Sequence, residues 1–287
     1  MEQSSLTTTL MPIALGTIML GLGLSLTIED FRRVTRYPKA MTIAMVCQMI
    51  LLPAICFVLV ILFDLDPALG VGLMLLSASP GGATANLYSH LSHGDVALNI
   101  SLTAINSVLT LFTLPLIVNF SLGYFMSSDQ YVPMQFSKII EVFAVVLTPV
   151  LLGMLIRNKA QGFAAKMDKP VKILSALFLV LIILSVTLRE KDKLGFYFSQ
   201  MGIPVLTFNI LSMLIGYYLP LLFKVEKKQA IAIGLEIGIH NGTLAIYIAL
   251  NVLNNSSMSL PPAVYSLIMF FTAAAFGFLV NVGKNRP

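Results

Sequence analysis

The stretch "ASPGGATANLYSH", Ala78 to His90, interrupts an apolar segment with residues that break a helix. Pro80 removes a backbone hydrogen-bond donor and clashes with the preceding turn, while Gly81 and Gly82 lower the helix propensity further. In a lipid bilayer, the peptide groups freed by such a break need partners from protein or ligand. The stretch therefore predicts a membrane-spanning helix that is broken where the backbone lines a cavity or holds a ligand. A kinked helix packed against a neighbour is the alternative.

The composition of the whole chain is that of an integral membrane protein. Of its 287 residues, 57% are hydrophobic and 11% charged, with a mean hydropathy of +0.89, well outside the range of soluble domains. A helix crosses the hydrocarbon with about 20 apolar residues, so we expect an all-α membrane protein forming a single transmembrane domain over residues 1–287. Hydropathy predicts nine spans, at residues 6–28, 40–63, 67–91, 96–120, 136–156, 171–188, 202–223, 230–252 and 263–282.

The 18 Lys and Arg residues are divided unequally between the two sides of this bundle. Fourteen follow the first, fifth, seventh and ninth spans, and four lie on the opposite side. Because cytoplasmic loops are enriched in Lys and Arg, we expect a multi-pass protein of the cell (inner) membrane, with its N-terminus outside and its C-terminus in the cytoplasm. This topology also explains the net charge of +5, so the expected partner is the lipid bilayer and no nucleic acid.

A second polar interruption, "GLEIGIHNGTLAIYIAL", runs from Gly234 to Leu250 in the eighth predicted span, where Asn241 and Gly242 supply the break. Four spans followed by five fit two inverted repeats, about 6–120 and 136–282, if the first repeat lacks its opening helix. Both interruptions are then second-last in their repeats. Such matching interruptions indicate the binding site of a secondary transporter.

Glu236 is the only acidic residue well inside a predicted span. A carboxylate at that depth is costly, so it is expected to have a partner or a function. No basic residue is predicted at its depth, and the oxygens of Asn86, Asn99 and Thr103 suit a hard cation such as Na⁺. A protonated Glu236 that is hydrogen-bonded in the protein interior is the alternative.

A polar stripe runs along the fourth predicted span. Asn99, Thr103, Asn106 and Thr110 are separated by steps of four, three and four residues, which places them on one helical face. Asn99 and Thr103 are expected to reach the first break. Asn106 and Thr110 are equally well explained as hydrogen-bonding contacts between helices.

Residues next to the two breaks are candidates for binding a substrate. Thr84 and Asn86 follow the first break and Asn241 forms the second, so they and the nearby half-helix amides are expected to reach an anion. His240 lies one turn after Glu236. It is either a carrier of a coupling proton or a hydrogen-bonded interior residue.

No transition-metal site and no disulfide bond are expected. His90 and His93 form a His-x-x-His pair without a third ligand. Cys47 and Cys56 lie within one apolar stretch, where each is expected to be a small buried hydrophobic residue.

Three segments resemble the bile acid sodium symporter family. "PGGATANLYSHLSHGDVALNISLT" (Pro80 to Thr103) and "LEIGIHNGTLA" (Leu235 to Ala245) look like its two signature regions, and "LGLGLSLTIEDFRRV" (Leu20 to Val34) looks like its early-helix pattern. The similarity covers nearly the whole chain. It implies a nine-span member that lacks the opening helix, with a panel domain and a core domain in which two broken helices cross.

The resemblance implies two sodium sites. One would use Asn86, Thr103 and Glu236 with Ala85 and Asn99, at two positions where the family usually has serine.

The other implied site would use Gln48, Glu236 and His240, with backbone around Ile237 and Ile239. The family has glutamine at the position of His240. A neutral imidazole offers one nitrogen lone pair in place of an oxygen, so coupling to one sodium ion, or to sodium and a proton, is an alternative to coupling to two sodium ions.

We therefore expect a sodium-coupled secondary transporter (symporter) of an organic anion, working by alternating access. A bile-acid-like molecule or a small carboxylate such as pantoate or a keto acid would suit it. A proton-coupled or mixed sodium/proton transporter and a non-transporting membrane sensor are the alternatives. No enzyme is expected, because no serine or cysteine is well placed beside His240 and Glu236, and no cofactor is expected besides Na⁺ as coupling ion.

Overall fold

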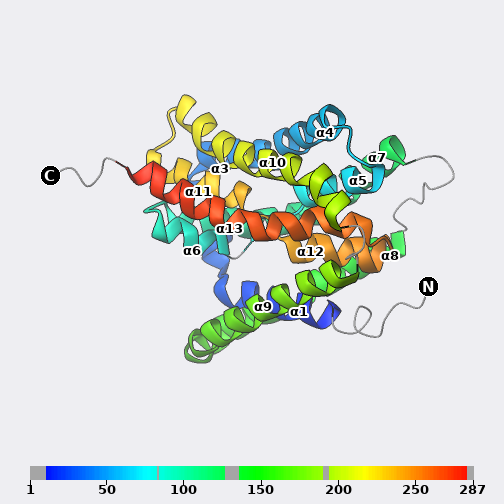
Figure 1. Cartoon of the computed structure of the whole chain (residues 1–287). Coiled ribbons are helices and arrows are strands. Elements are labelled where there is room, and N and C mark those ends of the chain that lie inside the picture. Colours follow the sequence, from blue (N-terminus) through cyan, green and yellow to red (C-terminus); the bar gives the residue numbers. More distant parts are fainter. Residues whose placement is uncertain (1–10, 83, 127–135, 190–193, 283–287) are drawn as a thin grey trace.

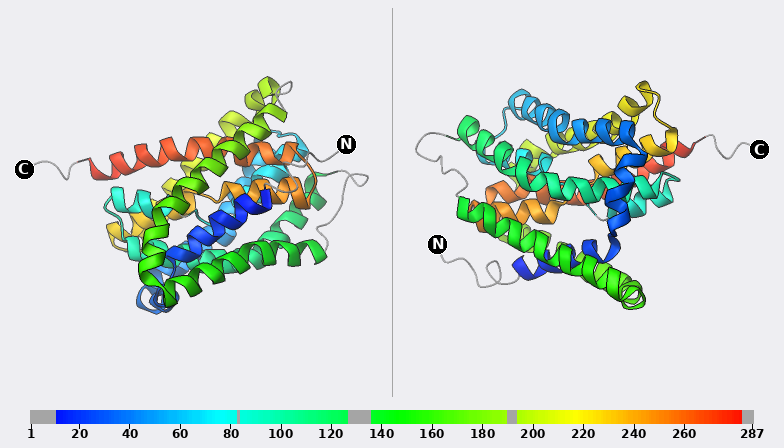
Figure 2. Two further views of the ribbon diagram at one scale, coloured as in Figure 1. Left: turned by 90° about the horizontal axis from the view of Figure 1, so that it is seen from below. Right: turned by 180° about the vertical axis from the view of Figure 1, so that it is seen from behind.

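The computed structural model describes residues 11–82, 84–126, 136–189 and 194–282. Within these ranges every regular element is a helix. Most helices run along one direction, which is horizontal in Figure 1. The first helix begins at one end of the bundle and the last helix finishes at the other (Figures 1 and 2).

Three helices, α1 (Met11–Ser25), α8 (Phe136–Lys159) and α9 (Gln161–Arg189), pack on one another and form the lower part of the molecule in Figure 1. α1 and α8 cross closely because Gly153, on α8, has no side chain to hold the two backbones apart. A Cβ atom on Gly153 would lie 2.6 Å from the carbonyl oxygen of Leu20. In a membrane, small residues at a crossing allow the close backbone packing that holds helices together. We call these helices the three-helix layer.

The remaining helices form a larger layer that contains both interrupted spans, and we call it the core layer (Figure 2). Its helices are α3 (Pro38–Val46), α4 (Leu52–Leu62), α5 (Pro67–Ser77), α6 (Thr84–Leu91), α7 (Val96–Phe125), α10 (Leu194–Leu222), α11 (Lys227–Gly238), α12 (Gly242–Tyr247) and α13 (Leu260–Asn281), with the π-helical turns η3 (Cys47–Leu51) and η5 (Ile248–Val252) and the 3-10 turn η6 (Ser257–Ser259).

A bent connection leads from the three-helix layer into the core layer. α1 and the short helices α2 (Ile28–Arg32) and η2 (Arg33–Arg36) differ in direction by 74°. The backbone N–H and the hydroxyl of Thr27 both donate to Asp30, at 2.8 and 2.7 Å, and Arg33 binds the same carboxylate at 2.9 Å. Bonding of this kind fixes the start of a helix, so the turn is well defined.

Five helices of the described chain are long and apolar enough to cross a membrane, or six if the bent pair at the start counts as one span. The prediction of an all-α, multi-pass membrane protein is confirmed. The number of nine spans and their division into two inverted repeats are more detailed than this finding and stay predictions. The five helices are Pro38–Leu62, Val96–Phe125, Ile140–Lys159, Ser199–Leu222 and Ser257–Asn281, and two shorter apolar helices are Pro67–Ser77 and Gly242–Val252.

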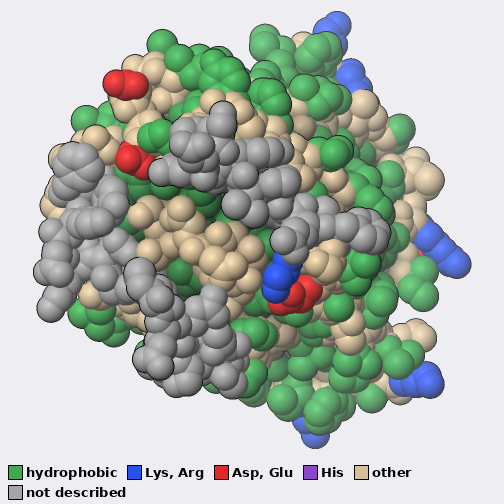
Figure 3. All heavy atoms as spheres, turned by 90° about the vertical axis from the view of Figure 1, so that its right-hand side faces the viewer, with side chains coloured by type: hydrophobic (Ala, Val, Ile, Leu, Met, Phe, Trp, Pro, Cys, Tyr) green, Lys and Arg blue, Asp and Glu red, His purple; other side chains and the backbone are tan. Residues whose placement is uncertain are grey.

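The outer surface is largely apolar, as helices that face lipid require. Leu222 and Phe271, for example, are each 78% exposed. Figure 3 views the molecule from the right-hand side of Figure 1. Most Lys and Arg side chains lie around the edge of this view, while one basic and one acidic side chain lie beside each other near its middle, among hydrophobic and uncharged groups.

Both interruptions predicted from the sequence are breaks in the structure. A short non-helical stretch separates α5 from α6, and another separates α11 from α12. At the first break, the hydroxyl of Ser79 donates to the carbonyl of Leu76 at 2.7 Å, a local bond that competes with continuing the helix. The second interrupted span is the most enclosed part of the described residues, since every residue from Ala230 to Leu250 is buried.

Candidate functional site

The two breaks meet inside the core layer. The backbone N–H of Gly82 donates to the carbonyl of Ile239 at 2.7 Å, and that of Asn241 donates to the carbonyl of Pro80 at 2.8 Å. These two bonds form an isolated antiparallel bridge. Each break therefore satisfies peptide groups that the other exposes, as an apolar environment requires. We call this meeting point the crossing.

Glu236 lies in the last turn of α11, beside the crossing, and is fully buried. Its carboxylate packs so tightly on the first break that a Cβ atom on Gly81 would overlap it. The Thr103 hydroxyl donates to one of its oxygens at 2.7 Å and the Asn106 amide donates to the other at 3.1 Å. None of the ion pairs formed by the described residues includes Glu236. Two neutral donors only partly compensate a buried carboxylate.

The polar stripe on α7 meets Glu236 at its middle. Asn106, which the sequence left undecided between a site residue and a helix contact, touches the carboxylate directly. Asn99 instead donates through its amide nitrogen to the carbonyl of Ala232, at 2.7 Å, one turn before Glu236. The stripe thus holds α7 against α11 along two turns.

Several buried oxygens on these helices have no donor. The side-chain oxygens of Asn86, Asn99 and Asn106, and the hydroxyl of Thr110, are buried without a hydrogen-bond partner. A buried acceptor without a donor costs about 1–3 kcal/mol, whereas a bound hard cation uses such oxygens as ligands. The helices that carry them, α6 and α7, pack on each other and on α11. The region beside Glu236 is therefore suited to a cation.

A second polar group at the crossing involves Gln48 and His240, which converge on Ser79. The Gln48 amide donates to the carbonyl of Ser79 at 3.1 Å, and Nδ1 of His240 lies 3.1 Å from the same oxygen. A carbonyl only accepts, so Nδ1 carries the proton and Nε2 of the neutral ring carries the lone pair. Nε2 and the Gln48 side-chain oxygen are both buried without a partner. Gln48 lies in the π-helical turn η3, a feature common at functional sites.

Two residues that the sequence analysis did not single out complete the end of α11. The Asn209 amide and the Tyr265 hydroxyl donate to the carbonyl of Gly238, at 3.1 and 2.9 Å. The Tyr265 ring also meets the ring of His240, with centroids 5.4 Å apart. In the sequence, Asn209 could have been noticed as an amide within an apolar span, because such a group in a membrane is expected to have a buried partner.

The predicted substrate-binding residues lie where the two half-helices begin. Asn241 caps α12, because its side-chain oxygen accepts the N–H of Leu244 at 3.1 Å. This leaves its amide nitrogen as the group that can bind an anion. Thr84 is exposed at the start of α6, and Asn86 is half-buried. Both half-helices thus present their N-terminal ends, which favour negative charge, near the crossing.

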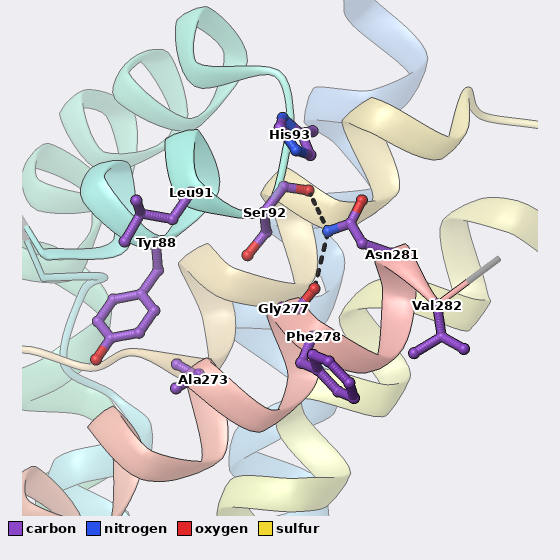
Figure 4. A pocket seen from close by; sticks show the side chains of 10 residues that line it. Tyr88, Leu91, Ser92, His93, Ala273, Gly277, Phe278, Asn281 and Val282 are labelled. Atoms are coloured by element: carbon purple, nitrogen blue, oxygen red, sulfur yellow. Dashed lines mark hydrogen bonds between the residues drawn. The ribbon is translucent and has the colours of Figure 1, made fainter. Parts of the chain in front are cut away.

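An open groove of about 570 Å³ lies between the end of α6 and the last turns of α13. Figure 4 shows Asn281 beside it, donating to the carbonyls of Ser92 and Gly277 at 2.9 and 2.8 Å. None of the described residues that line it is a predicted sodium-binding or substrate-binding residue. The candidate site is therefore the crossing. The lining residues are Tyr88, Leu91, Ser92, His93, Ala273, Ala274, Gly277, Phe278, Asn281 and Val282.

The cysteine and histidine residues outside the crossing form no recognisable centre. Cys47 and Cys56 are free, buried thiols. Within the described part of the chain, no group of three or more His, Cys, Asp or Glu side chains is placed to hold a metal ion, and this includes His90 and His93.

The sequence matches the profile of the "Sodium Bile acid symporter family" over residues 12–197, more than half of the chain. The chain belongs to this family. The matched segment contains the first break and the polar stripe, while Glu236 and the second break lie beyond it.

Proteins with similar sequences come from plants, bacteria and mammals. The chain is 27% identical over 282 residues to "Probable sodium/metabolite cotransporter BASS2, chloroplastic" of Oryza sativa subsp. japonica, covering 98% of this chain and 65% of that protein. It is 28% identical over 261 residues to "Uncharacterized sodium-dependent transporter YocS" of Bacillus subtilis (89% and 78%). It is 28% identical over 235 residues to the "P3 protein" of Mus musculus (78% and 47%). The chain spans less than two thirds of these plant and mammalian relatives.

The resemblance to the sodium bile acid symporter family implied a particular set of sodium ligands. Of that set, Thr103 is hydrogen-bonded to Glu236, whereas Asn99 is bonded to the carbonyl of Ala232 one turn earlier on the same helix. Ala85 is fully buried and offers no side-chain oxygen. Asn106, which the resemblance did not include, contacts the carboxylate, so the donors around Glu236 differ in part from the implied set.

Proposed function

We propose that this protein is a sodium-coupled symporter of an organic anion, working by alternating access between the three-helix layer and the core layer. The observation that carries the proposal is the buried carboxylate of Glu236 at the crossing of two broken spans. It has neutral donors only, and buried oxygens without donors lie on the adjoining helices. A cation bound there would supply the positive charge that balances the Glu236 carboxylate, and it would also be the partner that those oxygens lack.

Sodium is the cation that this chemistry favours. The proposed ligands on α6, α7 and α11 are all oxygens, from Asn86, Asn99, Thr103 and Glu236, and hard cations prefer oxygen. Asn106 orients the carboxylate through its hydrogen bond. The names of the rice and Bacillus subtilis relatives, which specify sodium, support the same coupling ion for this chain.

A second cation position is proposed at Gln48 and His240. Its free acceptors are the Gln48 oxygen and Nε2 of His240. An imidazole nitrogen is a poorer ligand than an oxygen for a hard cation. This favours coupling to the single sodium ion at Glu236, with a proton at His240 as the alternative.

The proposed cargo is an organic anion, bound where α6 and α12 begin. Thr84, Asn86 and the Asn241 amide lie at these ends, whose free N–H groups attract negative charge. The rice relative is named as a sodium/metabolite cotransporter and the family is named for bile acid. A bile-acid-like molecule or a small carboxylate is therefore the class to test.

In the proposed cycle, sodium at Glu236 shifts the population toward the state that binds the anion. The core layer then moves against the three-helix layer and exposes the crossing to the other side of the membrane. The unequal distribution of Lys and Arg supports a cell-membrane location with the N-terminus outside and the C-terminus in the cytoplasm.

Glu236→Gln tests the proposal, because it keeps the shape of the side chain and removes its charge. Purified full-length protein is screened for sodium-dependent thermal stabilisation, and proteoliposomes are assayed for uptake of labelled taurocholate, pantoate and pyruvate with and without a sodium gradient. At a sodium concentration 100 times the Kd, stabilisation of the wild type is expected to be about 2.7 kcal/mol. The variant is expected to lose both stabilisation and uptake.

Glu226→Gln is the matched control, because it makes the same change at the exposed start of the same helix. It is expected to keep both properties. Uptake by Glu236→Gln at the wild-type rate with the same sodium requirement would overturn the proposal. Sodium-dependent binding of an anion without any uptake would identify a sensor.

A further inference from the structure

The three-helix layer and the core layer are joined by side-chain contacts near one end of the bundle. The hydroxyl of Tyr247, on α12, donates to Glu141, on α8, at 3.4 Å. The other oxygen of Glu141 binds Lys138 at 2.7 Å. The rings of Phe112, on α7, and Phe143, on α8, lie with centroids 5.5 Å apart. Both of these contacts use the same short stretch of α8; elsewhere α1 also packs on α12 and α9 on α13.

The hydrogen bond between Tyr247 and Glu141 joins a buried side chain to a partly exposed one. Tyr247 is 1% exposed, whereas the Glu141 side chain is 41% exposed. The carboxylate can thus exchange its tyrosine partner for water at modest cost, while the tyrosine ring stays within the core layer. A long hydrogen bond with one exposed partner is weak, as a contact that must break in every transport cycle has to be.

Tyr247 is also connected closely to the crossing. α12 begins at the second break, where Asn241 caps it, and Tyr247 is its last residue. Asn251 donates to the carbonyl of Tyr247 at 3.3 Å, so the following π-helical turn holds its backbone. A shift of α12 caused by a ligand at the crossing would therefore move the Tyr247 hydroxyl relative to α8.

We propose that Tyr247 and Glu141 form a latch that keeps the gap between the two layers closed at this end of the bundle. In Figure 1, α12 and the start of α8 lie toward the right, which is the end where α1 begins. By the distribution of basic residues this is the outer side. The inference rests on the proposed alternating access: opening the outer side moves α12 away from α8 and breaks the bond. Because coupling between sites is reciprocal, a weakened latch also changes sodium affinity at Glu236.

Tyr247→Phe tests the latch, since it removes only the hydroxyl. The full-length protein in lipid nanodiscs is examined by hydrogen–deuterium exchange. We expect several-fold faster exchange both in residues 242–252 and in residues 137–150, because opening exposes both faces of the contact. Glu141→Met, which removes the acceptor and keeps the length of the side chain, is expected to do the same. The double variant should show little more than the larger single effect, because both changes remove one interaction.

Tyr218→Phe is the control, since Tyr218 is an exposed tyrosine on α10. It is expected to leave exchange in both segments unchanged. The latch is overturned if Tyr247→Phe leaves exchange unchanged, if the control raises it equally, or if the rise is confined to residues 242–252. Sodium-dependent thermal stabilisation of the wild type is measured in parallel. If sodium did not stabilise the wild type, the sodium proposal would be wrong, while the exchange data would still test the latch.

Discussion

Thr103 and Glu236, which are 133 residues apart in the sequence, are joined by a hydrogen bond of 2.7 Å from the hydroxyl to the carboxylate. The bond connects the polar stripe of α7 to the last turn of α11, beside the second break. It also places a hydroxyl oxygen next to the carboxylate that we propose as the main sodium ligand. Four predictions test this arrangement and its surroundings.

Thr103→Val is expected to weaken sodium binding with little change of shape, because valine keeps the branched side chain and removes the hydroxyl. The loss of one oxygen ligand of the bound cation is taken at about 1–3 kcal/mol, as for a hydrogen bond to a charged group, which means a Kd roughly 5 to 150 times higher. Binding of radioactive sodium to purified protein measures this. Thr113→Val is the control on the same helix, where the hydroxyl bonds the Leu109 carbonyl and the Met49 sulfur. If the two changes raised the Kd for sodium equally, Thr103 would not be a sodium ligand.

Gly81→Ala is expected to destabilise the protein and abolish sodium-dependent stabilisation, since the added methyl group would overlap the Glu236 carboxylate. Overpacking of this kind costs about 1–3 kcal/mol or more. The thermal unfolding midpoint, measured with and without sodium, reports both effects. Gly16→Ala meets nothing within 4 Å, so the better helix propensity of alanine should leave stability equal or higher. A Gly81→Ala protein as stable and as sodium-responsive as the wild type would contradict the tight contact.

His240→Gln is expected to increase the dependence on sodium, because an amide can still donate to the Ser79 carbonyl and adds an oxygen beside Gln48. The sodium dependence of uptake should change from non-cooperative in the wild type to cooperative in the variant, as occupancy of two coupled sites requires. Initial rates of uptake at a series of sodium concentrations measure this. Unchanged curves would show that His240 does not limit a second ion.

Gly153→Ala is expected to loosen the three-helix layer without altering sodium binding. Its methyl group would lie 2.6 Å from the Leu20 carbonyl oxygen, in backbone that cannot easily move, at a cost of about 1–3 kcal/mol. Gly162→Ala, on α9, meets nothing within 4 Å and serves as the control. Thermal unfolding gives the stability, and sodium titration of the folded protein should give a Kd equal to that of the wild type. A lower sodium affinity would instead show that the crossing of α1 and α8 affects Glu236.

The two breaks could be predicted because their causes are local. Proline and adjacent glycines disfavour a helix wherever they occur, and an Asn-Gly pair does the same in an apolar run. The importance of Glu236 could also be predicted, since a carboxylate among apolar residues is costly in any fold.

The partners of these groups were harder to predict. Asn106 could not be separated from a simple helix contact, because periodicity shows that four residues share a face without showing which of them meets Glu236. The carbonyl of Gly238 is satisfied by Asn209 and Tyr265, which come from two other helices. Their contribution depends on how those helices are rotated about their axes.

By itself, the sequence determined that this protein is a helical membrane protein with two broken spans and an acid, Glu236, well inside one of them. The reason is that lipid imposes the same requirement on every segment: apolar side chains outside, and peptide groups satisfied within the segment. Only the tertiary structure decided that the breaks satisfy each other, that Thr103 and Asn106 hold Glu236, and that Tyr247 reaches Glu141. These contacts depend on the rotation and crossing of helices far apart in the chain, which packing between helices sets and local sequence does not.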